Sequence, residues 1–139
     1  MEIHVLNLKR QPHRKQKFIK YNSKCVDKIT FFEAIDGNTI GESELNNMRQ
    51  NNLLKGDFKI MNKYIIGHAM SQRKLWLKCI ETNKNLFYFE DDSVLREDFV
   101  EQYNSCIQRL PADWDFLSFG LNFERSTFPL VIDLKAFPS

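Results

Sequence analysis

The chain contains 139 residues, a length that suits a single domain over residues 1–139. Its 42% hydrophobic and 13% aromatic content, which includes 12 phenylalanines, favours a packed core and argues against a disordered chain. Because 20 basic and 18 acidic side chains give a formal net charge of only +2, the overall charge gives no reason to expect nucleic acid as a partner.

No stretch of the sequence approaches the roughly 18 consecutive apolar residues of a membrane-spanning helix, and the N-terminal residues lack the features of a signal peptide. The cysteines Cys25, Cys79 and Cys106 are widely spaced, which favours reduced, buried thiols over a zinc site or a disulfide. We therefore expect a cytoplasmic protein whose membrane association is at most peripheral, at the inner face of the cytoplasmic membrane.

The first half of the sequence alternates between apolar runs and polar, helix-forming segments. Residues 2–8 predict a strand, and Pro12–Tyr21 predicts a helix because proline suits the first helical turn. β-Branched and aromatic residues predict a second strand over Ile29–Ile35, which the turn sequence Asp36-Gly37-Asn38 ends. A short polar helix is predicted over Glu42–Asn51.

Basic side chains are concentrated in the segment that follows the first predicted strand. They are Lys9, Arg10, His13, Arg14, Lys15, Lys17 and Lys20. Such a segment either binds an anionic ligand or forms the solvated face of a helix, and the pattern alone leaves both interpretations open.

The helical period is clearest in the second half, where apolar residues predict a long helix over Asn62–Thr82. The unbroken apolar run Leu86–Phe89 is typical of a central strand that is buried on both faces of a parallel sheet. A helix over Phe99–Leu110, ended by Pro111, and a strand over Asp115–Phe119 are predicted to follow.

The predicted order of elements is strand, helix, strand, two helices, strand, helix and strand. This alternation is typical of an α/β fold with a mostly parallel open sheet flanked by helices. After Gly120 the pattern weakens, so residues 121–139 predict an irregular tail or an incomplete C-terminal part with one weak strand candidate over Leu130–Leu134. We expect a fold that is truncated at this end.

Three consecutive acids, Glu90, Asp91 and Asp92, directly follow the apolar run and have no basic neighbour in the sequence. At about 4 Å and an effective dielectric constant of about 20, each pair of carboxylates would repel by about 4 kcal/mol, so a divalent cation would stabilise the cluster. On an extended chain Glu90 and Asp92 would point to the same side and could share that cation. The alternative is structural, because acids also cap the first turn of a following helix.

Five separated segments carry a more specific pattern. They are Ile3-His4-Val5-Leu6-Asn7-Leu8 with Arg10 and Arg14, Phe32-Glu33-Ala34-Ile35-Asp36-Gly37, Gly67-His68-Ala69-Met70-Ser71-Gln72 with Leu75-Trp76, Phe89-Glu90-Asp91-Asp92, and Leu110-Pro111-Ala112-Asp113-Trp114-Asp115. In order and spacing they resemble glycosyltransferase family 25, the bacterial lipooligosaccharide galactosyltransferase group, over residues 2–120. In the helix motif His68 replaces a family cysteine and Gln72 a family histidine, so His68 is either a displaced substitute or a core residue.

The resemblance implies a GT-A-like (Rossmann-like) fold that transfers a sugar, expected to be galactose, from a UDP-sugar to lipooligosaccharide or another glycan in lipopolysaccharide biosynthesis. It implies that Glu90 and Asp92 hold Mn²⁺ or Mg²⁺, the ions that oxygen ligands favour. The residues expected to bind the nucleotide-sugar are Asn7, Leu8, Arg10, Arg14, Ala34, Asp36, Gly37, Ser71 and Asp91, most of them at the ends of strands.

The sequence does not identify the general base that sugar transfer requires, and Asp115 and Glu124 are only weak candidates. One alternative is therefore a truncated, catalytically inactive homologue that binds a nucleotide-sugar or acts as a partner subunit. Another is a receiver-type phosphoacceptor domain, which the basic segment after the first strand disfavours. A second copy of the chain would cover a core left open by truncation.

Overall fold

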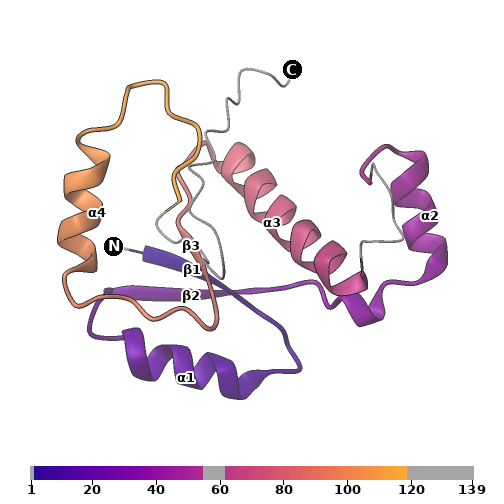
Figure 1. The fold of residues 1–139 in the computed structure, drawn as a ribbon, viewed down its shortest axis with the longest axis horizontal. Coiled ribbons are helices and arrows are strands. Elements are labelled where there is room, and N and C mark those ends of the chain that lie inside the picture. Colours follow the sequence, from indigo (N-terminus) through magenta and orange to yellow (C-terminus); the bar gives the residue numbers. More distant parts are fainter. Residues whose placement is uncertain (1, 55–61, 119–139) are drawn as a thin grey trace, which may run out of the picture. The chain divides into compact units, whose positions relative to one another are not determined.

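The computed structural model describes residues 2–54 and 62–118 (Figure 1). Its elements are strand β1 (Glu2–Asn7), helix α1 (Pro12–Asn22), strand β2 (Lys28–Glu33), the 3₁₀ turn η1 (Gly37–Thr39), and helices α2 (Glu42–Gln50) and α3 (Lys63–Thr82), followed by strand β3 (Tyr88–Glu90) and helix α4 (Phe99–Ile107). The chain divides into two compact units, Met1–Glu101 and Gln102–Ser139, and each is described by itself.

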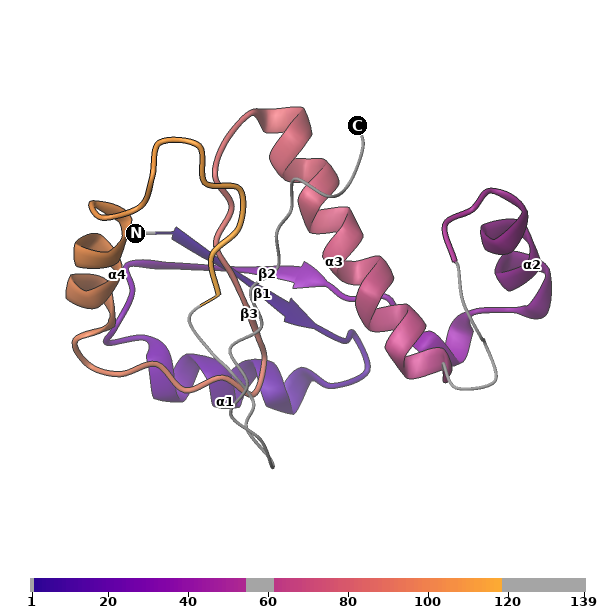
Figure 2. The ribbon, with the colours of Figure 1, turned by 45° about the horizontal axis from the view of Figure 1, so that its top comes forward.

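The first unit contains a parallel sheet of three strands in the order β2-β1-β3 (Figure 2). β1 pairs with β2 from Glu2 opposite Lys28 to Asn7 opposite Glu33, and it pairs with β3 from His4 opposite Tyr88 to Leu6 opposite Glu90. The α/β class, the parallel sheet and all four predicted helices are therefore confirmed. The fold is consistent with a Rossmann-like glycosyltransferase fold.

The central strand of the described sheet is β1, and this differs from the prediction. β3 was expected in the centre but lies at an edge of the described strands, where its residues are partly exposed. Ile3 and Val5 of β1 are fully buried. The apolar run before the acids has another cause: Phe87 and Phe89 both pack against Phe99, at ring-centroid distances of 5.5 Å.

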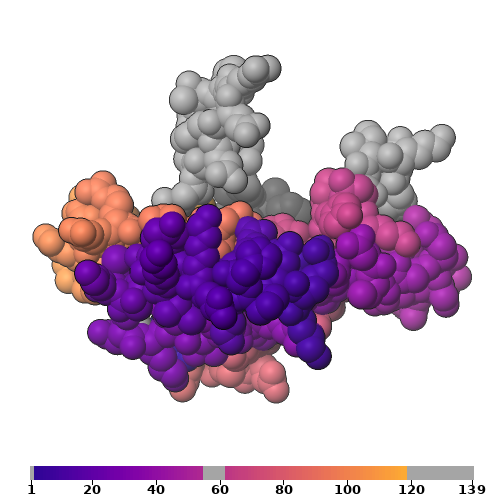
Figure 3. Space-filling view, turned by 90° about the horizontal axis from the view of Figure 1, so that it is seen from below, coloured from indigo at the N-terminus to yellow at the C-terminus, as the bar shows by residue number. Residues whose placement is uncertain are grey.

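Helices α1 and α3 cover opposite faces of the sheet (Figures 1 and 2). On the α1 face, Phe18 is almost completely buried and meets Phe31 of β2 edge to face, with 6.1 Å between ring centroids. Indigo atoms of the N-terminal segment occupy the middle of this side of the molecule in Figure 3. An apolar layer thus anchors α1 and places its N-terminus beside the end of β1.

α3 contacts the segment after β2 through backbone atoms. A methyl group added at Gly67 would lie 2.7 Å from both the carbonyl oxygen of Ile35 and the nitrogen of Gly37, and a methyl group at Gly37 would overlap the backbone of Lys63. The buried Ser71 hydroxyl accepts a hydrogen bond from the Ile35 nitrogen at 2.8 Å and donates to the Gly67 carbonyl at 2.7 Å. Close packing of this kind requires glycine.

A buried amide connects α1 to the segment after β3. Asn22 donates to the carbonyl oxygens of Phe18 and Ser93, at 3.0 Å each, and accepts from the nitrogen of Leu95 at 2.8 Å. Its side chain is fully buried, so these hydrogen bonds hold the chain that leaves β3 against the last turn of α1.

In the second unit, the predicted strand over Asp115–Phe119 is not present in residues 115–118, and Phe119 lies outside the described residues. A strand is stable only when it is paired, and the apolar pattern cannot report whether a partner is available. Residues 121–139, including the strand candidate over Leu130–Leu134, also lie outside the described part.

The three cysteines are free thiols, but each is only partly buried. Free thiols are as expected, and the expected burial is partial. Within residues 2–54 and 62–118, no helix combines the length and the apolar content that crossing a lipid bilayer requires.

Candidate functional site

The site lies where the three parallel strands end, at the carboxyl edge of the sheet. This edge carries Asn7 at the end of β1, Asp36 after β2, and Glu90, Asp91 and Asp92 at and after the end of β3. Because parallel strands end on the same side, residues that are distant in the sequence meet there.

Residues Glu90–Ser93 form what we call the acid turn. β3 ends at Glu90, and the nitrogen of Ser93 donates to the Glu90 carbonyl oxygen at 3.1 Å. The side chains of Glu90 and Asp92 are 55% and 66% exposed, whereas that of Asp91 is only 8% exposed. The expected extended geometry from Glu90 to Asp92 is therefore wrong, because a strand persists only while a neighbouring strand pairs with it, and here the chain turns after Glu90.

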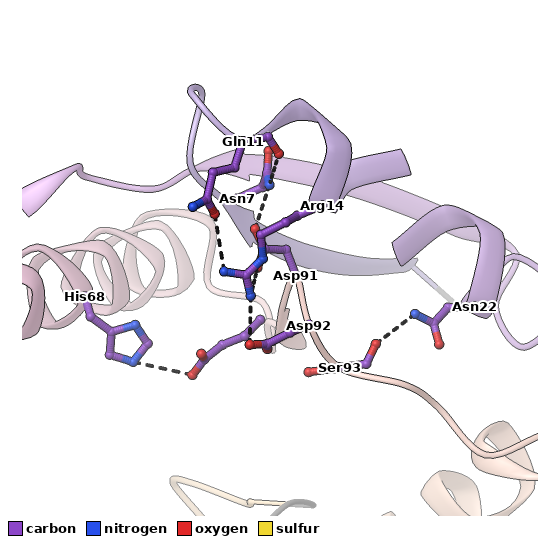
Figure 4. Close-up of polar contacts among 9 residues, drawn as sticks. Asn7, Gln11, Arg14, Asn22, His68, Asp91, Asp92 and Ser93 are labelled. Carbon is purple, nitrogen blue, oxygen red and sulfur yellow. Dashed lines mark hydrogen bonds and ion pairs between the residues drawn. The ribbon is translucent and has the colours of Figure 1, made fainter. Parts of the chain in front are cut away.

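The buried carboxylate of Asp91 has two polar partners. The Asn7 amide donates to its Oδ2 at 2.6 Å, and Arg14 Nη2 lies 2.7 Å from its Oδ1 (Figure 4). The same Asn7 amide also donates to the carbonyl oxygen of Gln11 at 3.2 Å. A buried charge needs such partners, so Asn7 and Arg14 fix the acid turn beside the N-terminus of α1.

Arg14 also reaches the exposed part of the acid turn. Its Nη2 lies 2.7 Å from Asp92 Oδ2, and its Nη1 donates to Gln11 Oε1 at 3.2 Å. Figure 4 shows the guanidinium between Gln11 and the two aspartates. The acids have no basic neighbour in the sequence, but the fold brings one to them: Arg14, which lies 77 positions before Asp91.

The β2 side of the edge carries a second ion pair, between Arg10 and Asp36. The Asp36 carboxylate accepts a hydrogen bond from the nitrogen of Asn38 at 3.0 Å and thereby caps η1. This backbone hydrogen bond, followed by that from Arg10, holds the pKa of Asp36 below its usual value. Leu8 directly follows β1 and Ala34 directly follows β2, and the nitrogen of Ala34 donates to the Asn7 carbonyl at 3.0 Å.

Two predicted nucleotide-binding residues, Ser71 and Gly37, are buried behind the edge and contact protein groups. Ser71 is 1% exposed and both of its hydrogen-bonding directions are used by protein groups. Gly37 is buried against the first turn of α3, so its missing side chain makes room for the helix. The packing against α3 accounts for a glycine at this position, and close approach of a ligand to Gly37 stays a prediction.

α3 contributes a polar pair that faces the acid turn. His68 is about half exposed, with its Nε2 3.5 Å from Glu90 Oε1 and 3.0 Å from Gln72 Nε2. Burial raises the pKa of Tyr88, the neighbouring residue on β3, and the charge of Glu90 adds to this shift. The interpretation of His68 as a core residue is wrong, since positions four residues apart share one helix face and this face meets the end of β3.

The carboxylate oxygens at this edge suit a metal ion that is also bound by a phosphate group of the substrate. In the described ranges, no cluster of three or more histidine, cysteine, aspartate or glutamate side chains is placed to hold a metal. Mg²⁺ and Mn²⁺ commonly bind one or two carboxylates and complete their coordination with substrate phosphates and water. The exposed carboxylates of Glu90 and Asp92 match such a partial set of ligands.

The two candidates for the general base lie outside the unit that forms this edge, and both stay predictions. Asp115 belongs to the second unit, and Glu124 lies outside the described residues. The sequence did not single out Gln11, which contacts Arg14, and it left His68, which contacts Glu90, open as a substitute or a core residue. Their signal was the position of Gln11 directly before the helix and the spacing of His68 and Gln72.

A parallel α/β sheet with charged residues gathered at its carboxyl edge defines a Rossmann-like domain of the kind that glycosyltransferases use. The sequence profile described as "Glycosyltransferase family 25 (LPS biosynthesis protein)" matches residues 1–134, and the chain belongs to this family.

A curated relative is the "Procollagen lysyl hydroxylase and glycosyltransferase" of Acanthamoeba polyphaga mimivirus. It is 27% identical over 128 residues, and the match covers 82% of this chain and 14% of the relative. The chain therefore spans a small part of that relative's length.

Proposed function

We propose that the carboxyl edge of the sheet binds the diphosphate of a UDP-sugar donor, from which the enzyme transfers galactose to a lipooligosaccharide or other glycan hydroxyl. One observation carries this proposal. The acid turn is fixed to α1 through buried Asp91, and it presents the exposed carboxylates of Glu90 and Asp92, with Arg14 in contact with Asp92.

Glu90 and Asp92 would hold Mn²⁺ or Mg²⁺ together with the donor. The ion, when bound, would neutralise the negative charge that develops on the departing UDP. Arg14 and Arg10 would donate hydrogen bonds to phosphate oxygens, a role that suits the planar guanidinium. Asp36, whose carboxylate stays ionised, would accept from a ribose or uracil group.

Asn7 and Asp91 have a supporting role in this proposal. Both side chains are 8% exposed and their hydrogen bonds are made to each other, to Gln11 and to Arg14. They would keep the acid turn and Arg14 in place while the exposed groups contact the donor. Preorganised groups of this kind avoid the entropic cost of ordering on binding.

Titration calorimetry with UDP and with UDP-galactose, in the presence and absence of Mn²⁺, tests the donor site. We expect metal-dependent binding that Asp92→Asn weakens at least about tenfold, because a charged ligand of the ion is lost. Asp98→Asn is the matched control, since Asp98 is an acid outside the acid turn and pairs with Arg96. Nucleotide binding that is independent of metal and unchanged in Asp92→Asn would contradict the proposal.

Transfer is tested separately, with UDP-galactose and truncated lipooligosaccharide as acceptor. Formation of a galactosylated product would establish the enzyme, whereas donor binding without transfer would favour the catalytically inactive homologue. Two further predictions concern partners: a second copy of the chain, checked by light scattering, and peripheral contact with the inner face of the cytoplasmic membrane, checked by sedimentation with anionic vesicles.

A further inference from the structure

Arg14 makes two ion pairs that differ in their surroundings. With Asp91 it contacts a carboxylate that is 8% exposed and also hydrogen bonded to Asn7, and with Asp92 it contacts one that is 66% exposed. Both contacts are 2.7 Å long and both use Nη2. The guanidinium itself is held from the other side by Gln11.

The two contacts should therefore differ in how readily they break. Separating Arg14 from Asp91 would leave a buried charge without one of its partners, which is costly. An exposed ion pair such as that with Asp92 contributes little, because water and salt compete with it. The contact with Asp92 is the one that a ligand can replace.

We propose that Arg14 is a donor-binding residue that exchanges Asp92 for a donor phosphate. This inference rests on the proposed function. Before the donor binds, the guanidinium contacts Asp92 in the place of a cation. A phosphate oxygen of the donor would then replace Asp92 as the partner of Nη2, and the Asp92 carboxylate would be free to hold the ion. Asp91 and Gln11 keep Arg14 in position throughout.

The exchange makes the binding of nucleotide and metal cooperative. A metal ion alone would have to break the contact between Arg14 and Asp92 and would leave the guanidinium without a replacement. A nucleotide alone could bind Arg14 only by breaking the contact between Arg14 and Asp92, which would leave the Asp92 carboxylate without a cation. When both bind, each released group gains a new partner, so each ligand raises the affinity for the other by the same factor.

The test is to measure two affinities in variants of Arg14. Electron paramagnetic resonance of free Mn²⁺ gives the affinity for the metal alone, and calorimetry at saturating Mn²⁺ gives the affinity for UDP. In Arg14→Gln we expect Mn²⁺ alone to bind about fivefold more tightly, because Asp92 no longer has a competing cation. UDP should bind about tenfold more weakly, because a charged hydrogen bond to phosphate is lost.

Arg10→Gln is the matched control for the metal measurement. It removes the same charge from the same edge, but Arg10 pairs with Asp36 and does not contact the acid turn. We expect it to change the affinity for Mn²⁺ alone less than twofold. Equal tightening in Arg10→Gln and Arg14→Gln would indicate a general charge effect and would overturn the exchange.

Arg14→Lys covers the case in which Arg14→Gln fails to fold, as judged by circular dichroism. A single ammonium cannot contact Asp91, Gln11 and Asp92 with the geometry of the guanidinium. We therefore expect Arg14→Lys to bind Mn²⁺ alone more tightly and UDP more weakly, both by smaller factors than Arg14→Gln. If neither folded variant binds Mn²⁺ more tightly, Arg14 does not compete for Asp92 and the inference is wrong. The proposed function fails in a different way, by absence of UDP binding to the wild-type chain at any Mn²⁺ concentration.

Discussion

The two faces of the sheet are built differently. The α1 face is an apolar layer in which Phe18, Phe31 and the inward residues of β1 exclude water. The α3 side also buries Leu75 completely, but it adds backbone contacts at glycine and polar groups, among them Ser71 and the pair formed by His4 and Lys78. The comparison teaches that both sides bury apolar side chains, whereas close backbone packing at glycine distinguishes the α3 side.

Phe18→Ala is expected to have the largest effect, because it removes a buried aromatic ring from the α1 face. Loss of a ring of this size from a core costs about 3–5 kcal/mol of unfolding free energy. Urea denaturation followed by circular dichroism measures this change. Trp76→Ala is the control on the α3 side, where the indole is half exposed and the expected loss is below about 1 kcal/mol. Equal losses would show that buried Phe18 contributes no more to stability than a half-exposed aromatic side chain.

Asn22→Ala should have the next largest effect. It leaves two carbonyl groups and the nitrogen of Leu95 without their partner in a buried place, which should cost about 2–3 kcal/mol. The same denaturation experiment measures it. Hydrogen exchange of the Leu95 amide should also accelerate in the variant, and an unchanged rate would show that Asn22 does not hold the segment after β3.

Gly67→Ala tests the backbone contact of α3. The added methyl group would overlap the backbone of Ile35 and Gly37, and overpacking of this kind costs about 1–3 kcal/mol. Gly41→Ala is the matched control, since a methyl group there has no neighbour within 4 Å among the described atoms. If the two variants unfold at the same urea concentration, α3 does not pack on the β2 end as closely as the contact indicates.

The smallest effect concerns His4, a polar group of the α3 face. Burial, followed by the charge of Lys78, lowers its pKa below the ordinary value of about 6.5, with Lys28 adding to this shift and Glu2 opposing it. The unfolded chain therefore binds a proton more readily, so stability is present above about pH 6.5 and decreases as the pH falls toward the folded pKa. The slope of unfolding free energy between pH 5 and 7 should be smaller in His4→Gln, and an unchanged slope would contradict this assignment.

Local periodicity predicted most of the fold correctly, because helices and strands with one apolar face carry that face in their residue spacing. Pro12, the turn after Ile35 and the long apolar period of α3 all gave elements at the expected places. The position of β3 in the sheet was not predictable in this way. An apolar run reports burial, and here Phe99 rather than a further described strand accounts for it.

For the candidate site, the sequence located the acids at a strand end and correctly expected Arg14 at the same edge. It could not divide the acids into a buried one and two exposed ones, since that depends on where the chain turns after Glu90. It also could not show that Ser71 and Gly37 face the interior of the fold. The burial of Ser71 and Gly37 results from the packing of α3, which a local sequence pattern cannot predict.

By itself the sequence determined the α/β alternation, the family and the presence of charged groups at the strand ends, because these follow from the order and local spacing of residues. Only the tertiary structure decided which charges meet. Arg14 and Asp92 are 78 positions apart and are joined at 2.7 Å because parallel strands end on one side and α1 starts beside that edge. Contacts between residues so far apart depend on how helices pack on the sheet.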